Sequence, residues 1–383
     1  MSRKVLQKRD LWVGDKQADI GLKVERPFQI LGLTTSLTVG DLIANVFFFS
    51  CLANQFEHSR LHVKYRNARP YCRDVMSLSP WIDRAEPIAG EWPEWLYKLR
   101  PRLKPRRHAE IGPLDGGRAY YYDMIVTNTM ARDTTIYALP NPAVFRLPDD
   151  RAESLRRELV ACGLKSDRWF ATFHYRDKSY IFGQRYAELN GDPEAFDSLV
   201  DDIIALGGQA VRIGHPGMAP FAPREGFVDL SLRSNSFMLQ AAAVSHARFM
   251  ISGPSGPMTL PMAFAIPYTL VDATDAGGVW GLAYTDVLTH EVTTPEGKVL
   301  RNSTLREAGL LSSFRLTDVM RSDPRYTMRK ANASELRIVA QRLFDRTAGI
   351  NGWRPPPELP KTPKPNSINW PLRPEYPMDW LKL

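Results

Sequence analysis

Short apolar runs that alternate with amphipathic segments are the feature that most constrains the fold of this chain. Four such runs have the length and composition of buried strands: Trp169–His174, Gln209–Gly214, Arg248–Ser252 and Pro267–Val271. Around them, the pattern favours helices at residues 194–206, 236–245, 258–265 and 336–343. Strands that alternate with helices through short, glycine-marked links are typical of a doubly wound parallel sheet.

The first part of the chain carries a shorter version of this pattern. The apolar run Phe28–Leu33 is followed by the turn-rich link Thr34–Asp41 and by a helical segment that starts at Leu42. His62–Tyr65 and Met124–Asn128 are expected to be further strands of the same sheet. Because a strand, a glycine-containing loop, a helix and a strand open an α/β unit, the predicted fold class is α/β with two Rossmann-like halves.

The domain boundary is expected where proline and charge become frequent, near residues 140–150. This places an N-terminal domain over residues 1–148 and a C-terminal domain over residues 149–350. Residues 351–383 are rich in proline and tryptophan, and proline precludes a long helix or a central strand there. A disordered tail would normally lack so many aromatic residues, so we expect an extended strap against the body of the protein.

The composition of the 383 residues limits the class of protein. Hydrophobic residues make up 44%, enough for a substantial core. The net charge of +8 suits an acidic ligand, nucleic acid or an anionic membrane, and it selects none of them. Three cysteines without CxxC spacing argue against a disulfide framework or a structural zinc site. With no secretory signal and no long apolar stretch recognised, we expect a cytoplasmic protein, soluble or peripheral to the membrane.

The sharpest local motif is the segment that follows the strand at Ile251. It runs through Gly253, Pro254, Ser255 and Gly256 directly into a predicted helix that contains Thr259. Unpaired N–H groups and the two hydroxyls could hold a phosphate or a diphosphate there, and glycine lets the backbone approach the ligand closely. The alternative is an ordinary tight turn between a strand and a helix.

Basic residues follow two neighbouring predicted strands. His174 and Arg176 are two positions apart at the end of the first strand and so share a face, and Arg212 ends the next strand. Arg185 lies in the loop between them. Guanidinium groups form paired, charge-assisted hydrogen bonds with a diphosphate, so the set indicates an anion site. The alternative for Arg176 is a surface ion pair with Asp177.

In the first half, Gly40 and Asp41 lie where a strand meets a helix. A carboxylate there could accept a proton from an attacking hydroxyl, although aspartate is also a favoured N-cap residue. Metal chemistry is not predicted, because HExxH and a DxD motif are both absent. The absence of GxGxxG, GxxxxGKS/T and GxSxG weakens the dehydrogenase, P-loop NTPase and α/β-hydrolase alternatives.

The segment from Ala171 to Leu310 resembles a family of bacterial proteins described as glycosyltransferases. Members carry a strand ending in His-x-Arg, a loop Arg, a strand ending in Arg-x-Gly, and a strand–Ser-Gly–helix segment ending in Phe-x-x-Pro. The matching residues are His174-Tyr-Arg176, Arg185, Arg212-Ile-Gly214, and Ser255-Gly256 through Phe264-Ala-Ile-Pro267. The His-x-Arg strand is also similar to that of O-fucosyltransferase-like enzymes, and Gly40-Asp41 is similar to the first loop of bacterial heptosyltransferases. Where the family often has Asn, this chain has Asp272.

The resemblance implies a GT-B-like architecture of two facing Rossmann-like domains, and a glycosyltransferase whose donor is a nucleotide-diphosphate sugar. Asp41, Arg176 and His174 are then the catalytic candidates, with Asp41 as base for the acceptor hydroxyl. The donor-binding candidates are Arg185, Arg212, Gly214, Gly253, Pro254, Ser255, Gly256 and Thr259. Cationic groups would stabilise the departing diphosphate without a metal ion, so no cofactor is expected beyond the nucleotide-sugar co-substrate.

The acceptor is expected to be a glycan, a lipid-linked molecule or a small molecule, and nucleic acid is not expected as a partner. Two alternatives stay open. The first is a sugar-nucleotide epimerase or hydrolase of the same fold, which needs no acceptor. The second is a non-catalytic basic module that binds nucleic acid or an anionic membrane, and it predicts steeply salt-dependent binding.

Overall fold

The computed structural model describes a defined part of the 383 residues. The described residues are 27–34, 36, 38–54, 56, 58–88, 109–115, 118–122, 124–127, 144–179, 189–234, 236–273, 285–289, 291–300, 322–350 and 352. The chain divides into two compact units, Met1–Arg146 and Leu147–Leu383, which we call the first and the second unit. Arg185 and residues 353–383, the greater part of the predicted strap, lie outside the described residues.

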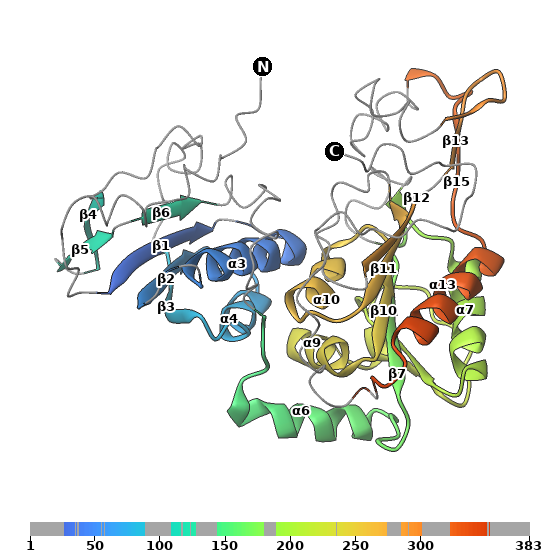
Figure 1. Ribbon diagram of the computed structural model, residues 1–383, viewed down its shortest axis with the longest axis horizontal. Coiled ribbons are helices and arrows are strands. Elements are labelled where there is room, and N and C mark those ends of the chain that lie inside the picture. Colours follow the sequence, from blue (N-terminus) through green and yellow to red (C-terminus); the bar gives the residue numbers. More distant parts are fainter. Residues whose placement is uncertain are drawn as a thin grey trace. The chain divides into compact units, whose positions relative to one another are not determined.

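The first unit is built on a parallel sheet with strand order β3-β2-β1-β6 (Figure 1). Its strands are β1 (Phe28–Thr34), β2 (Ser59–Tyr65), β3 (Ile82–Pro87) and β6 (Met124–Thr127). The helices α3 (Val39–Ala53) and α4 (Tyr71–Ser77) follow β1 and β2, and the antiparallel pair β4 (Ala109–Asp115) and β5 (Arg118–Tyr122) precedes β6. The predicted strands at residues 28–33, 62–65 and 124–128 are therefore present, and β3 is an additional one.

Helix α3 packs closely against β1 through its aromatic residues. A Cβ at Gly32 would lie 2.5 Å from Cδ2 of Phe49, so only glycine permits this approach of helix to strand. The helix begins three residues before the predicted Leu42 because the hydroxyl of Thr38 caps it, accepting a hydrogen bond from the N–H of Asp41. The start of α3 is thus held at the carboxyl end of β1.

The second unit contains a six-stranded parallel sheet with strand order β12-β11-β10-β7-β8-β9. Its strands are β7 (Phe170–His174), β8 (Gln209–Arg212), β9 (Phe227–Asp229), β10 (Phe249–Ser252), β11 (Tyr268–Ala273) and β12 (Thr285–Thr289). The chain adds β8 and β9 on one side of β7 and then crosses to add β10, β11 and β12 on the other. This is the order of a Rossmann fold, and the winding reverses between β7 and β10.

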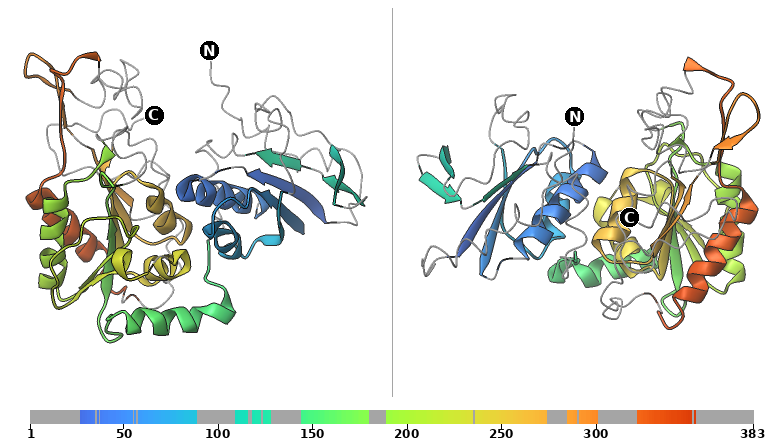
Figure 2. Two further views of the ribbon diagram at one scale, coloured as in Figure 1. Left: turned by 180° about the vertical axis from the view of Figure 1, so that it is seen from behind. Right: turned by 45° about the horizontal axis from the view of Figure 1, so that its top comes forward.

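Helices cover both faces of this sheet, as Figures 1 and 2 show. On one face lie α7 (Pro193–Ala205) and α13 (Ala333–Arg346), which pack on each other; α9 (Phe237–His246) and α10 (Thr259–Ala263) lie on the other. Helix α6 (Asp149–Ala161) packs against α9. The apolar core between the sheet and the first face includes Phe173, Phe196 and Leu336. The second unit is therefore a doubly wound α/β sheet, as predicted from the sequence.

The segment after β10 differs from the predicted helix over residues 258–265. A turn of 3-10 helix, η4 (Gly256–Met258), leads into α10, which has only five residues. The helix ends because Ala265 adopts the left-handed conformation, with φ of 56°, just before Pro267. A small antiparallel sheet of β13 (Glu291–Thr293), β14 (Val299–Leu300) and β15 (Thr327–Arg329), and the short helix α8 (Leu230–Arg233), complete the described elements of this unit.

Candidate functional site at the strand ends of the second unit

The carboxyl ends of β7 and β10 bring together two of the predicted motifs. The N–H of Gly253 donates a hydrogen bond of 2.9 Å to the carbonyl oxygen of His174, which extends the pairing of these strands beyond β10. The loop that starts at Gly253 therefore begins beside the segment Tyr175–Asp177. In doubly wound sheets, ligands bind at the point where the strand order reverses, and this point lies between β7 and β10.

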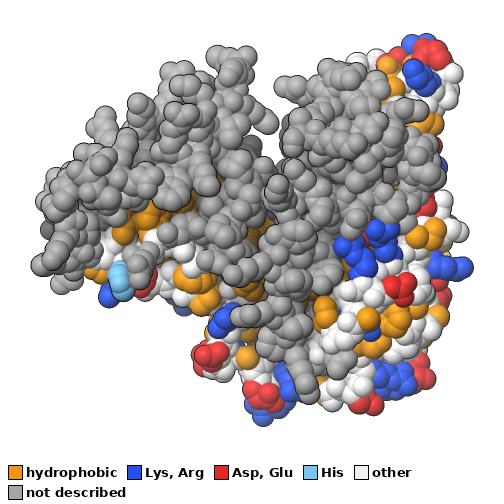
Figure 3. Space-filling view, viewed as in Figure 1, with side chains coloured by type: hydrophobic (Ala, Val, Ile, Leu, Met, Phe, Trp, Pro, Cys, Tyr) orange, Lys and Arg blue, Asp and Glu red, His pale blue; other side chains and the backbone are white. Residues whose placement is uncertain are grey.

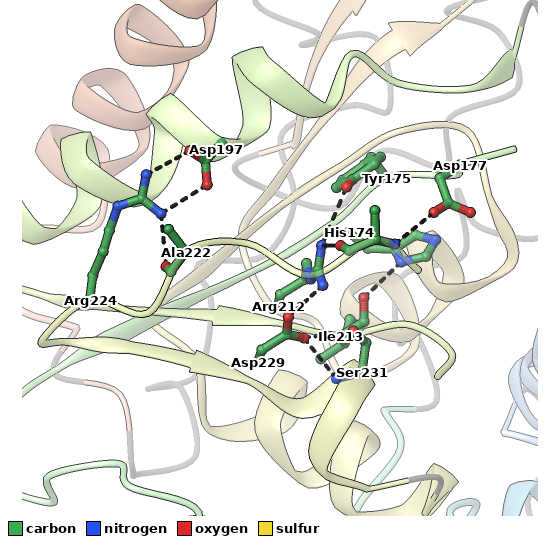
Figure 4. A network of polar contacts seen from close by, with 11 residues as sticks. His174, Tyr175, Asp177, Asp197, Arg212, Ile213, Ala222, Arg224, Asp229 and Ser231 are labelled. Carbon is green, nitrogen blue, oxygen red and sulfur yellow. Dashed lines mark hydrogen bonds and ion pairs between the residues drawn. The ribbon is translucent and has the colours of Figure 1, made fainter. Parts of the chain in front are cut away.

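His174 ends β7 and is almost completely buried, with 4% of its surface exposed. Its Nδ1 lies 2.9 Å from the carbonyl oxygen of Ile213, which can only accept, so Nδ1 carries the proton (Figure 4). Burial lowers the pKa of His174 to about 4, against the opposing effect of the hydrogen bond to Ile213. The imidazole is therefore neutral near pH 7, with its lone pair on Nε2.

Arg176 follows His174 by two residues and is 9% exposed. Its carbonyl oxygen accepts a hydrogen bond of 2.8 Å from the N–H of Gly191, which ties the segment after β7 to the start of α7. The backbone of Arg176 therefore lies just beyond the carboxyl end of β7. The carboxylate of Asp177, which was the alternative ion-pair partner of Arg176, contacts Ser179, Ala219 and His215 instead.

Asp177 organises the loop after β7. Its carboxylate accepts hydrogen bonds from the N–H of Ser179 (2.9 Å) and the N–H of Ala219 (3.4 Å), and also from the Ser179 hydroxyl. Nε2 of His215 lies 3.8 Å from the same carboxylate and 3.3 Å from Oγ of Ser179. Asp177 therefore links the loop after β7 to the loop after β8, which sequence reasoning missed because the partners are more than thirty residues apart.

Arg212 occupies a different position from the predicted one. The side chain is fully buried and forms an ion pair with Asp229 at the end of β9 (Figure 4). The guanidinium also donates to the carbonyl oxygen of Ala219 (2.8 Å) and to the Tyr175 hydroxyl (3.3 Å), and it stacks on Phe221 at 4.3 Å. Because its charge is already compensated inside the unit, Arg212 supports the loop after β8 instead of presenting its guanidinium at the surface.

Tyr175 and Asp229 are the residues that hold Arg212, and sequence reasoning had not singled them out. Burial raises the pKa of the Tyr175 phenol to about 12, partly offset by the charge of Arg212. Asp229 also accepts from the N–H (3.1 Å) and the hydroxyl (2.6 Å) of Ser231, the second residue of α8. The only sequence signal for this pair is the place of Asp229 at the end of a short apolar run.

Gly214, the glycine of the Arg-x-Gly motif, lies close to Met218 and to the end of β7. A Cβ at this position would overlap Sδ of Met218 and would lie 3.6 Å from Nδ1 of His174. The side chain of Gln240 on α9 forms two hydrogen bonds with Gly214. Its Nε2 donates to the Gly214 carbonyl (2.7 Å), and its Oε1 accepts from the Gly214 N–H (3.0 Å). Gln240 was not predicted, because one glutamine within a helix carries no motif.

The residues of the predicted phosphate loop lie between β10 and α10. Gly253 is buried, whereas Pro254, Ser255 and Gly256 are half-buried. The Thr259 hydroxyl already donates to the carbonyl oxygen of Gly256 (2.8 Å). Since α10 has five residues, its dipole is small, and any anion here would depend on the loop and on the segment after β7. Asp272, the residue where the family often has Asn, is buried and accepts from the N–H of Ala331 (2.7 Å).

Asp41 belongs to the first unit, and its side chain is exposed at the start of α3. The Thr38 hydroxyl accepts a hydrogen bond from the N–H of Asp41 (3.3 Å), so Thr38, and not Asp41, caps the helix, and it donates another to Oδ2 of Asp41 (2.8 Å). Nearby, Nδ2 of Asn45 donates to the hydroxyls of Thr34 (2.9 Å) and Ser36 (2.7 Å). Polar groups thus gather at the carboxyl end of β1 as well.

The first unit also contains a largely buried cluster of charged and polar side chains that the sequence had not indicated. His62 and Lys64 of β2 contact Glu86 of β3, and Nδ1 of His62 contacts the Tyr122 hydroxyl. Burial is the largest cause lowering the pKa of His62, and the charge of Glu86 opposes it. Lys64 and Glu86 are each the next-to-last residue of their strand, and His62 lies two residues before Lys64.

The chain matches no family model and no curated protein. Among solved structures it is similar to a family 9 glycosyl transferase from Veillonella parvula (13% identity, 78% of this chain, 97% of that chain, TM-score 0.48). It is also similar to the E. coli ADP-heptose heptosyltransferase II (14%, 76%, 100%, TM-score 0.47). A third is the iron-containing dodecameric heptosyltransferase TibC of enterotoxigenic E. coli, solved with ADP-D-β-D-heptose (13%, 85%, 78%, TM-score 0.44).

These matched structures are glycosyltransferases, the class of protein that the sequence resemblance names. Because all three TM-scores are below 0.5, these likenesses carry no functional argument of their own. A function for this chain therefore has to be argued from its own residues. Within the described ranges, no group of three or more His, Cys, Asp or Glu side chains is placed to hold a metal ion. None of the described helices combines the length and the apolar character needed to cross a membrane.

Proposed function

We propose that this chain is a glycosyltransferase that transfers a sugar from a nucleotide-diphosphate sugar to an acceptor hydroxyl without a metal ion. The observation that carries the proposal is the hydrogen bond between Gly253 and His174 at the reversal point of the second sheet. It supports a donor site at which the loop 253–256 and the segment with Arg176 face one ligand. A nucleotide bound there would have its diphosphate beside both.

The predicted residues take separate roles in this proposal. Arg176 and Arg185 bind the departing diphosphate and stabilise its developing charge. Gly253, Pro254, Ser255 and Gly256 let the backbone approach it, with Thr259 at the end of the loop. Arg212 and Gly214 are positioning residues, because Arg212 holds the loop after β8 through Ala219 and Gly214 packs against His174.

The acceptor side of the reaction is assigned to the first unit. In a GT-B arrangement the two units face each other, and Asp41 takes the proton of the acceptor hydroxyl as general base. Its exposure at the start of α3 supports this role, since an acceptor could reach the carboxylate. The proposed acceptor is a glycan, a lipid-linked molecule or a small molecule, in the cytoplasm or at the surface of a membrane.

Ligand binding provides the first test. Thermal unfolding is followed with GDP-, UDP-, ADP-, CMP- and dTDP-sugars, because a ligand that binds the native state raises the melting temperature. We expect one nucleobase to give a clear shift that inorganic pyrophosphate reproduces only in part. No shift with any nucleotide sugar would contradict the proposal. Product analysis with the donor alone separates transfer from hydrolysis or epimerisation.

The Arg176→Ala variant tests the chemistry. Transfer is expected to fall by about 100-fold or more, as for the loss of one charge-stabilising group, while the melting temperature without ligand changes little. Arg224→Ala is the matched control, because Arg224 is bound to Asp197 on α7, away from the strand ends (Figure 4). Turnover near the unmodified level in Arg176→Ala would remove the assigned role.

The charges of the second unit do not favour a purely basic binding module. Basic and acidic side chains are interspersed on the part of its surface coloured in Figure 3. Several arginines of this unit are paired with carboxylates: Arg224 with Asp197, Arg337 with Asp202, and Arg342 with Asp286. Binding to nucleic acid or to anionic vesicles with a steep dependence on salt, and no response to nucleotide sugars, would reverse this preference.

A further inference from the structure

The second ring nitrogen of His174 is the feature that the proposed roles leave unexplained. Nε2 is buried and has no hydrogen-bond partner among the described residues. A buried polar atom without a partner costs free energy, and native structures retain few such atoms. At a reversal point between strands, an unsatisfied acceptor indicates a group that arrives with the ligand.

The orientation of the ring is strongly determined. On one side Nδ1–H donates to the Ile213 carbonyl at 2.9 Å. Gly214, the next residue, lies against the ring, and both its N–H and its carbonyl form hydrogen bonds with the side chain of Gln240. The backbone of His174 is fixed by Gly253. The ring therefore cannot turn over without breaking the contact to Ile213, so Nε2 keeps its direction.

The protonation state decides what this nitrogen can bind. Burial lowers the pKa of His174 to about 4; the nearby charge of Asp177 raises it, and those of His215 and Arg212 lower it. Near pH 7, Nε2 is therefore a hydrogen-bond acceptor only. A phosphate oxygen is also an acceptor and would be repelled, whereas a hydroxyl group would be bound.

We propose that Nε2 of His174 accepts a hydrogen bond from a hydroxyl group of the ligand, on its ribose or on its transferred sugar, and does not bind the diphosphate. This inference rests on the proposed function, since it names a contact within the same donor site. It changes the role expected from the sequence, in which His174 joined the arginines in stabilising the diphosphate. His174 then contributes to the choice of ligand through hydroxyl recognition.

The test compares ligands that differ by one hydroxyl. For the nucleotide sugar that shifts the melting temperature most, affinities are measured by calorimetry for the intact ligand, its 2′-deoxyribose and 3′-deoxyribose analogues and its mono-deoxysugar analogues. Ribose analogues and sugar analogues form separate arms, which identify the source of the hydroxyl. We expect one analogue to bind the unmodified protein roughly 10-fold more weakly than the intact ligand.

Variants of His174 decide whether this nitrogen is responsible. His174→Phe keeps a ring but removes the acceptor, and it is expected to bind that analogue and the intact ligand equally. His174→Gln restores an acceptor near the position of Nε2 and should recover part of the preference; it also serves if the Phe variant is unstable. His246→Phe is the matched control, because His246 is half-buried and its pKa is likewise lowered to about 4 by burial, but it lies at the end of α9.

The possible results separate the two claims. If the unmodified protein binds nucleotide sugars and His174→Phe still discriminates against every deoxy analogue as before, the hydroxyl contact is wrong while the proposed function stands. The hydroxyl contact is also wrong if His174→Phe weakens the binding of inorganic pyrophosphate as much as the binding of the intact ligand, because His174 would then contact the diphosphate. If the unmodified protein binds no nucleotide sugar, the proposed function fails, and this contact fails with it.

Discussion

The parallel sheets of the two units share their order over four strands but bury their charged side chains in different places. The first sheet runs β3-β2-β1-β6, and the second contains the equivalent run β9-β8-β7-β10. In the first unit, Lys64 and Glu86 pair across β2 and β3 at the same register, one residue before the end of each strand. They tie two neighbouring strands together across one face of the sheet.

In the second unit, buried polar side chains stand at the last residues of three neighbouring strands. His174 ends β7, Arg212 ends β8 and Asp229 ends β9. Ligands of doubly wound sheets bind beyond the carboxyl ends at the point where the strand order reverses, so His174 on β7, next to β10, can support a site. Lys64 and Glu86 lie on β2 and β3, whereas the order of their sheet reverses between β1 and β6. Burial of charge alone therefore does not identify a site; the position in the topology does.

The largest expected effect concerns the ion pair at the strand ends. Arg212→Met leaves the Asp229 carboxylate buried without its cation and is expected to destabilise the protein by about 3–5 kcal/mol. Urea unfolding of the variant measures this loss. The double variant Arg212→Met/Asp229→Leu should recover part of it, because two apolar side chains leave no buried charge. Equal stability of the single variant and the unmodified protein would remove the supporting role of Arg212.

Acid pH should act more strongly on the second unit than on the first. The pKa values of His174 and His246 are lowered to about 4 in the folded state, below the ordinary histidine value. The unfolded chain therefore binds more protons, and stability falls as the pH decreases from about 6.5 to about 4. Each histidine accounts for about 3 kcal/mol over this window.

Urea unfolding between pH 7 and pH 4.5 measures this effect. The slope of stability against pH should decrease in His174→Gln and in His246→Gln, because each variant removes one titrating group. His62 of the first unit also has a lowered pKa, but Glu86 opposes the shift, so His62→Gln should reduce the slope less. A slope that none of these variants changes would contradict the assignment of neutral, buried histidines.

Removal of the cation from the pair of Lys64 and Glu86 should have a smaller effect. Lys64→Met leaves Glu86, whose side chain is 20% exposed and also contacts Arg84 and His62. Because these contacts and water remain, we expect a loss of about 1–2 kcal/mol in urea unfolding and no change in nucleotide-sugar affinity. A loss as large as that of Arg212→Met would show that the two units bury charge at equal cost.

Two glycines of the strand-end loops are expected to differ, and the smallest effect of all is expected at Gly253. Gly214→Ala brings a methyl group into Met218 and is expected to lower stability by about 1–3 kcal/mol, and to weaken ligand binding by displacing His174. Gly253→Ala is its counterpart: the new Cβ would lie 3.7 Å from Cα of Tyr175, an ordinary contact, so stability should change by less than about 0.5 kcal/mol. Equal losses of stability in Gly214→Ala and Gly253→Ala, measured by urea unfolding, would contradict the expected difference between the two positions.

The order of strands and helices in the second unit could be predicted from local pattern. The runs around β7, β8, β10 and β11 are apolar and short, and Ser236 and Asp192 cap helices within a few residues of the predicted starts. In contrast, β3 was missed because Asp83, Arg84 and Glu86 interrupt any apolar run. The length of α10 was overestimated, because its sequence does not show that Ala265 adopts a left-handed conformation.

The sequence by itself determined the apolar strands β1, β7, β8, β10 and β11, and that His174, Arg176 and the loop after Ser252 lie at strand ends, since hydrophobic periodicity and glycine links act over a few residues. Only the tertiary structure decided that Gly253 forms a hydrogen bond with His174 and that Gln240 forms one with Gly214. It also decided that the charge of Arg212 is paired with Asp229 and that its guanidinium donates to Tyr175. Those partners lie from 17 to 79 residues apart along the chain. Their pairing depends on the crossover of strands and on the need of every buried charge for a partner, and no local pattern encodes either.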